Sequence, residues 1–136
     1  MKSSTWDIIY EAKENSILLE LPTPPSVNEC FAWYPKRHKS DKYKQWISLA
    51  EIEMLKQTRY KLSWDEWLRI DLNYFLPLYY KNWNHKKQDL DNLFKSLLDF
   101  LWDNIEWFED RNIKQLNAEK HNSELNIVKI RITEIG

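Results

Sequence analysis

Residues 90–102 read LDNLFKSLLDFLW, and this stretch decides the fold of the chain. Its apolar side chains recur every three or four residues, at Leu90, Leu93, Phe94, Leu97, Leu98, Leu101 and Trp102. Because an α-helix has 3.6 residues per turn, this spacing predicts one apolar stripe along an amphipathic helix. Asp91 and Lys95 are neighbours on that helix and flank the stripe.

Other parts of the chain supply a second helix and a sheet. A helix is predicted from Asp41, a candidate N-cap, to about residue 59. Strands are predicted over residues 16–21, 67–76, 113–121 and 125–132, and the short separation of the last two predicts a hairpin. We therefore expect an α+β fold in a single domain, with two amphipathic helices packed on a mixed β-sheet.

Composition excludes several classes of protein. The chain has 136 residues, of which 43% are apolar, and no apolar run approaches the ~18 residues of a membrane span. Its one glycine, Gly136, rules out the glycine-rich phosphate loops of nucleotide-binding proteins, so we expect no nucleotide cofactor. A single cysteine, Cys30, forms no internal disulfide, and the N-terminus lacks a signal-peptide pattern. We expect a cytoplasmic protein with no membrane contact.

The net charge of −1 hides an uneven distribution. Basic residues gather in two runs, the first with Lys36, Arg37 and Lys39 and the second with Lys86 and Lys87. Aromatic residues lie within or beside both runs, a combination typical of contact with phosphates and stacked bases. The alternative is a solvated face beside aromatic core residues.

Acidic residues open the predicted helix at residue 90. Asp89 and Asp91 follow the second basic run directly. One reading is that they cap the helix and that Asp91 forms an ordinary ion pair with Lys95. The other is that the carboxylates converge on a metal ion, and the local pattern leaves both readings open.

The wider pattern resembles a known family, the RusA-type Holliday junction resolvases of bacteria and their phages. The resemblance rests on PPSVN at residues 24–28, DLDNLFK at 89–95, and Glu109-Asp110 nineteen residues past Asp91. It continues through Lys120 to the last predicted strand, and covers residues 16–135. The resemblance divides the chain into an N-terminal extension, residues 1–15, and a nuclease domain, residues 16–136.

This resemblance implies an active site. Asp89, Asp91 and Asp110 match the family's essential acidic residues and Lys95 its essential lysine. Oxygen donors of this kind suit Mg²⁺, with Mn²⁺ as a substitute. The spacing selects Asp110 over Glu109, which is left as an accessory residue.

The same resemblance implies the function. We expect a homodimeric, structure-selective endodeoxyribonuclease that resolves four-way DNA junctions by symmetric nicking during recombination or repair. Asn28 and Lys120 are further candidates for DNA contact, although Asn28 also suits a turn and Lys120 an exposed strand edge. Two alternatives stay open: a branched-DNA-binding module without catalysis, and a metal nuclease that cuts flaps or other branched DNA.

Overall fold

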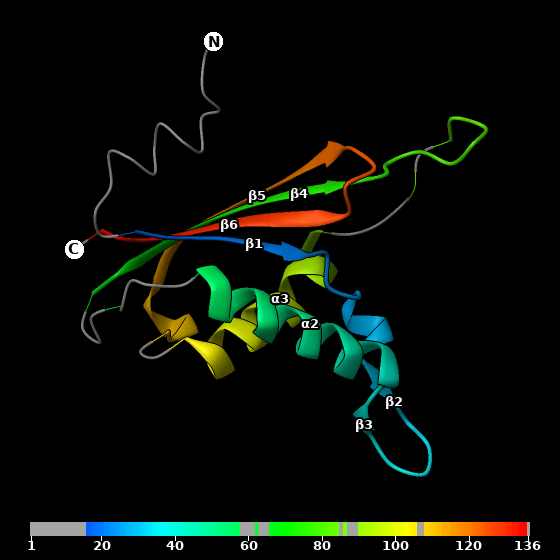
Figure 1. Cartoon of the computed structure of the whole chain (residues 1–136), viewed down its shortest axis with the longest axis horizontal. Coiled ribbons are helices and arrows are strands. Elements are labelled where there is room, and N and C mark those ends of the chain that lie inside the picture. Colours follow the sequence, from blue (N-terminus) through cyan, green and yellow to red (C-terminus); the bar gives the residue numbers. More distant parts are fainter. Residues whose placement is uncertain are drawn as a thin grey trace.

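The computed structural model of the chain describes residues 16–57, 62, 66–84, 86, 90–105 and 108–135, with the backbone only at positions 27, 91 and 92. Four strands form the main sheet: β1 (Ser16–Pro22), β4 (Leu68–Leu76), β5 (Ile113–Asn122) and β6 (Ile127–Glu134). Two helices, α2 (Asp41–Gln57) and α3 (Leu90–Asn104), lie on one face of it (Figure 1). Four short elements are the 3-10 helices η1 (Val27–Glu29) and η2 (Asp110–Asn112) and the strands β2 (Phe31–Ala32) and β3 (His38–Lys39). The expected extension, residues 1–15, lies outside the described residues.

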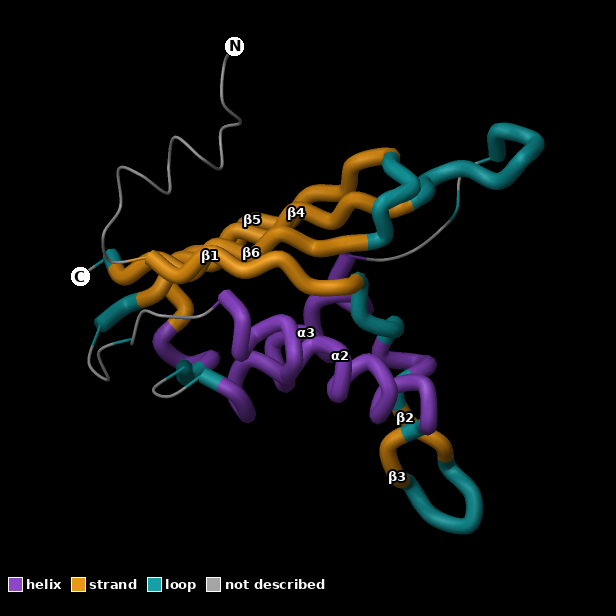
Figure 2. The backbone as a smooth tube through the Cα atoms, in the orientation of Figure 1, coloured by secondary structure: helices purple, strands orange, loops and turns teal. Residues whose placement is uncertain are grey.

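The main sheet is mixed, with strand order β1-β6-β4-β5. β6 pairs antiparallel with both β1 and β4, whereas β4 and β5 run parallel. Sheet and helices form separate layers, as Figure 2 shows. The α+β fold with two helices on a mixed sheet is confirmed.

The hairpin predicted between β5 and β6 is wrong, because β4 lies between these two strands. Their connection crosses the end of β4, where the Ser123 N–H donates to the Leu76 carbonyl over 3.0 Å. Strands two places apart in a sheet are separated by roughly 10 Å, which a four-residue turn can span. β4 takes the inner position because every second residue from Leu68 to Leu76 is buried, whereas β5 is polar and suits an edge.

The buried face of α3 is rotated from the predicted stripe. Leu93, Leu97 and Leu101 are fully buried as predicted, but Phe100 is buried too, and Trp102 is 51% exposed. The rotation arises because α3 packs against α2 as well as the sheet, and Phe100 meets the ring of Trp46 edge to face at 4.9 Å. The solvent-facing side of α3 is therefore rotated from its predicted position as well.

The N-terminus of α2 is capped by Ser40 rather than by Asp41. The Ser40 hydroxyl accepts the Tyr43 N–H at 3.2 Å, which is the geometry of a serine N-cap. The same hydroxyl donates to the Glu29 carbonyl at 2.6 Å. This residue therefore starts the helix and ties it to η1.

The sheet face opposite the helices carries a charged network. The Asp71 carboxylate on β4 accepts from Arg131 at 2.7 Å, from Arg69 at 3.2 Å and from Asn117 at 3.0 Å. Burial alone would raise the pKa of Asp71, but the hydrogen bonds from Arg131 and Asn117 outweigh it and hold the pKa below its ordinary value of 3.8. The network joins three neighbouring strands, β4, β5 and β6.

The Asp71→Asn variant tests this network. We expect its free energy of unfolding to fall by roughly 3 kcal/mol, because the side chain of Arg131 is only 7% exposed and would lose a charged partner. A carboxyl group with a lowered pKa stabilises the fold above its unfolded pKa and loses this effect as the pH falls through the folded pKa. Urea denaturation at neutral pH and below about pH 4 should therefore show a smaller acid dependence in the variant.

Lys56→Ala is the matched control, since Lys56 forms an exposed ion pair with Glu53 at 3.5 Å. Its removal should cost less than about 1 kcal/mol. Equal losses in the two variants would contradict a stabilising role for the network.

Candidate active site and nucleic-acid interface

The first turn of α3 holds the predicted acidic pair only in part. Asp89 lies outside the described residues, and Asp91 is placed by its backbone alone, as the second residue of α3. Lys95 is exposed on the next turn. Residues four apart on a helix are neighbours, so the backbone of α3 places positions 91 and 95 on one side.

Asp110 begins η2, directly before β5, and is exposed. It lies within electrostatic range of Asp99, the residue four positions after Lys95 on α3. Burial raises the pKa of Asp99 most, and the negative charges of Asp103 and Asp110 raise it further. The structure therefore places Asp110 within electrostatic range of the polar side of α3, although nineteen residues separate it from Asp91.

Asp99 is exposed as a whole residue, although its carboxyl group is partly desolvated, and sequence reasoning missed its place near Asp110. Its position eight residues after Asp91 was the available signal, because residues 91, 95 and 99 recur at helical spacing. The neighbouring Glu109 carboxylate lies 3.7 Å from the Arg111 guanidinium.

The first basic run forms a protruding hairpin of β2 and β3. Lys36, Arg37 and Lys39 are all exposed there. Positive charge from Lys39 and Arg37 opposes the rise in the pKa of Asp99, so both residues lie within electrostatic range of the acidic side of α3. The fold thus brings two charged groups that are far apart in the sequence within electrostatic range of one another.

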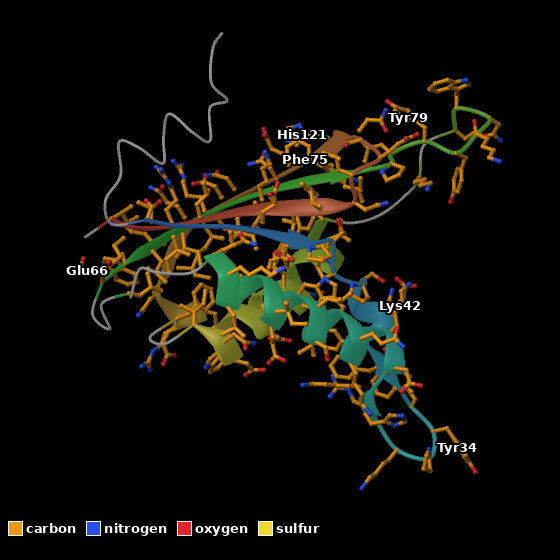
Figure 3. All side chains as sticks on the ribbon, viewed as in Figure 1. Tyr34, Lys42, Glu66, Phe75, Tyr79 and His121 are labelled. Atoms are coloured by element: carbon orange, nitrogen blue, oxygen red, sulfur yellow. The ribbon has the colours of Figure 1, made fainter. Side chains whose placement is uncertain are left out.

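The second basic run lies on the long connection between β4 and α3. Lys86 is half-buried, its N–H donates to the Leu78 carbonyl at 2.8 Å, and its ammonium lies 5.5 Å from the centre of the Tyr80 ring. Lys87 lies outside the described residues. Figure 3 shows Tyr79 of this connection and Tyr34 of the hairpin projecting from different corners of the molecule.

An open pocket of about 710 Å³ lies between these two projections. Lys86 and Tyr80 line it from one side, and Lys42 and Glu29, which form an ion pair at 2.6 Å, line it from the other. The Lys42 ammonium lowers the pKa of Glu29 by its hydrogen bond and charge. The pocket therefore offers two cations and one carboxylate.

Residues 24–28 are held against α3 through the Pro25 carbonyl, and α2 is joined to the same residue of α3. The Ser96 hydroxyl of α3 donates to the Pro25 carbonyl at 2.9 Å, and the Tyr43 hydroxyl donates to the Ser96 carbonyl at 3.1 Å. Asn28 is exposed on η1, as either of its predicted roles requires. Sequence reasoning missed Ser96, because one serine in an apolar helix gives no periodic signal.

Lys120 lies on the edge strand β5, opposite Tyr74 of β4, and is half-buried. The edge position fits either predicted role.

Three or more His, Cys, Asp or Glu side chains positioned to hold a metal ion are not found together among the described residues. The side chains of Asp89 and Asp91 lie outside the described part of the chain. The donor set expected at the site is three carboxylates, which fits a hard cation such as Mg²⁺.

The chain belongs to the family described as Endodeoxyribonuclease RusA, whose model matches residues 22–133. One relative is the Crossover junction endodeoxyribonuclease rusA of Lactococcus phage r1t, which is 33% identical over 72 residues. That match covers 50% of this chain and 55% of the relative, so it spans about half the length of each.

A solved structure, the periplasmic domain of Helicobacter pylori MotB (residues 90–256), superposes with a TM-score of 0.38 and 12% identity. The superposition covers 90% of this chain and 76% of that one. Similarity at this level is too low to bear on the site. None of the helices in the described part of the chain is long and apolar enough to cross a membrane.

Ser96→Ala tests the anchoring of residues 24–28 to α3. We expect the free energy of unfolding to fall by about 1 kcal/mol, because a buried hydrogen bond to the Pro25 carbonyl is lost. Ser48→Ala is the matched control, since its hydroxyl donates to the Lys44 carbonyl on an exposed helix surface. Urea denaturation should show a smaller loss in the control, and equal losses would contradict the anchoring role.

Proposed function

We propose that this protein is a metal-dependent endodeoxyribonuclease that cuts four-way DNA junctions. The observation that carries the proposal is the family match across residues 22–133, which contains every residue of the proposed active site. The approach of Asp110 to the polar side of α3 supports it, because the family resemblance places an acidic residue there. The phage relative is named for the same activity.

Asp89, Asp91 and Asp110 would hold Mg²⁺ or Mn²⁺. When bound, such an ion lowers the pKa of a water molecule and stabilises charge on a phosphodiester during hydrolysis. The Lys95 ammonium would contact the phosphate and offset the negative charge that develops there. Removing such a contact slows the reaction more than it weakens substrate binding.

Lys36, Arg37 and Lys39 on the hairpin, with Lys86 and Lys87 before α3, would contact DNA phosphates. Asn28 and Lys120 are further candidates for contact with DNA. A local set of cations binds DNA by releasing counterions, whatever the net charge of the whole chain. The placement of the hairpin beside Asp99 would guide a DNA strand towards the acidic side of α3.

The active assembly would be a homodimer. A four-way junction has two equivalent cutting sites, and a twofold-symmetric dimer offers one active site to each. Apolar side chains on α3 that the core leaves partly uncovered, Phe94, Leu98 and Trp102, supply a surface of the required kind. The dimer would act in the cytoplasm, where chromosomal and phage DNA are found.

Substitution of the carboxylates tests the catalytic role. Asp91→Asn and Asp110→Asn should each reduce the cleavage of a synthetic four-way junction by at least 100-fold in Mg²⁺, while junction affinity in chelator stays within about threefold. Cleavage slows because the asparagine carboxamide binds a metal ion more weakly than the carboxylate does. Junction affinity is kept because the carboxamide carries no negative charge that would repel DNA. Single-turnover cleavage and gel-shift titration measure the two quantities.

Glu109→Gln is the comparison for Asp110→Asn, because it neutralises the neighbouring carboxylate, which pairs with Arg111. As an accessory residue, Glu109 should matter far less to cleavage than Asp110. Wild-type cleavage rates in Asp91→Asn would contradict the assignment. If the wild-type protein binds junctions but cuts nothing with either metal, it is a branched-DNA-binding module. Equal cutting of flaps and junctions would make it a more general nuclease of branched DNA.

Neutralising the second basic run tests the DNA track. The double variant Lys86→Ala, Lys87→Ala should reduce the slope of log affinity against log salt by roughly one to two, with a similar loss for all forms of DNA. Titration of a junction and a duplex at several salt concentrations measures the slope. Lys56→Ala and Lys44→Ala on α2 should leave it unchanged, and an unchanged slope in the Lys86, Lys87 variant would place the track elsewhere.

A further inference from the structure

Two large aromatic side chains project from the tip of the β2–β3 hairpin. Trp33 is 70% exposed and Tyr34 is 89% exposed. Figure 3 shows Tyr34 at the end of the loop, pointing away from the helices and the sheet. Exposing this much aromatic surface on a narrow tip is unfavourable in water, and such surfaces mark interaction sites.

The base of this hairpin is firmly attached. The Ser40 N–H donates to the Cys30 carbonyl at 2.8 Å, closing the hairpin, while the Ser40 hydroxyl holds the Glu29 carbonyl at 2.6 Å. Cys30 is fully buried. The tip is therefore carried on a fixed stem rather than on a free loop.

One cation organises the rings inside the hairpin. The Arg37 guanidinium lies 3.8 Å from the centre of the Phe31 ring and 5.4 Å from that of Trp33. Phe31 in turn meets the buried Tyr43 edge to face at 6.0 Å. This series connects the exposed Trp33 ring to the core through cation–π and aromatic contacts.

The charge around the tip indicates which kind of partner the hairpin can bind. Residues 31–40 include Lys36, Arg37, His38 and Lys39 and contain no acidic residue. A cationic rim around exposed rings suits a polyanion with flat faces, because bases stack on aromatic side chains while phosphates meet the cations. An apolar protein partner would leave these cations desolvated and unpaired.

We propose that Trp33 and Tyr34 stack on base faces exposed at the branch point of DNA, and so make this hairpin an element that selects branched over continuous duplex DNA. In a continuous duplex each base pair is covered by a neighbour on both sides, so no face is free for stacking. Where the arms of a branch point are unstacked, the base pair at the end of each arm lacks one neighbour and exposes a face. The inference rests on the proposed function and adds a source of selectivity to it.

The location of the stem fits this role. Arg37 and Lys39 lie within electrostatic range of Asp99 on the side of α3 that Asp110 approaches. Rings that hold the branch point would therefore position a nearby strand along the acidic side of α3. Phosphate contacts alone position DNA but do not distinguish a junction from a duplex of the same charge density.

The experiment compares the double variant Trp33→Ala, Tyr34→Ala with the wild type in chelator, where binding is measured without cleavage. The probes are a synthetic four-way junction and a linear duplex built from the same arm sequences. Trp67→Ala is the matched control, because Trp67 is 46% exposed and has the Lys114 ammonium 6.0 Å from its ring. Trp67 directly follows Glu66, which Figure 3 labels at the end of the molecule remote from Tyr34.

We expect the double variant to bind the junction about tenfold more weakly, with duplex affinity and the salt slope of junction binding unchanged, since stacking releases no counterions. Trp33→Phe, Tyr34→Phe should restore most of the junction affinity, because the rings are kept. Trp67→Ala should behave as the wild type. Thermal unfolding and sedimentation should show the same fold and assembly in all four proteins.

Three results would overturn the proposal: unchanged junction affinity in the double variant, an equal loss on junction and duplex, or a loss explained by dissociation of a dimer. Failure of the proposed function is a separate result. A wild-type protein that selects junctions through these rings but cuts none with Mg²⁺ or Mn²⁺ would retain the stacking role and lose the nuclease assignment.

Discussion

The packing of α3 against the sheet and α2 is the interaction on which the rest of the structure depends. Burial of Leu93, Leu97, Phe100 and Leu101 removes one side of this helix from water and fixes its rotation. Once that rotation is set, positions 91, 95 and 99 must lie on the opposite side. The hydrophobic core therefore determines where the polar chemistry of the molecule can be.

Local pattern predicted the elements well, because burial imposes a period on the sequence. β4 alternates buried and half-buried residues over its whole length, and its boundaries were predicted to within one residue. The pairing of the strands was harder to predict than their positions. The partner of β5 is determined by contacts distant in sequence, and the polar sequence of β5 has no alternation that indicates which strand lies beside it. The two-residue strands β2 and β3 are too short to produce any period.

Sequence alone predicted the residues around the candidate site only in part. The family resemblance selected Asp110, which lies within electrostatic range of Asp99 on α3, and its role in catalysis stays a prediction. Ser40 and Asp41 are both good capping residues, so sequence alone could not decide between them, whereas the hydrogen bond to Tyr43 does. The rotation of α3 depends on the contact of Phe100 with Trp46 of α2. The periodicity of the α3 sequence carries no information about a residue on another helix.

The position of β6 has a consequence for how the chain is made. β6 follows every other strand in the sequence, yet in the sheet it lies between β1 and β4 and pairs with both. While a ribosome is still synthesising residues before 127, β1 has no partner in the main sheet, and one edge of β4 is open. Unpaired edges of apolar strands invite association with other chains. The nascent chain therefore carries unpaired strand edges until β6 has been synthesised, and the main sheet can close only after that point.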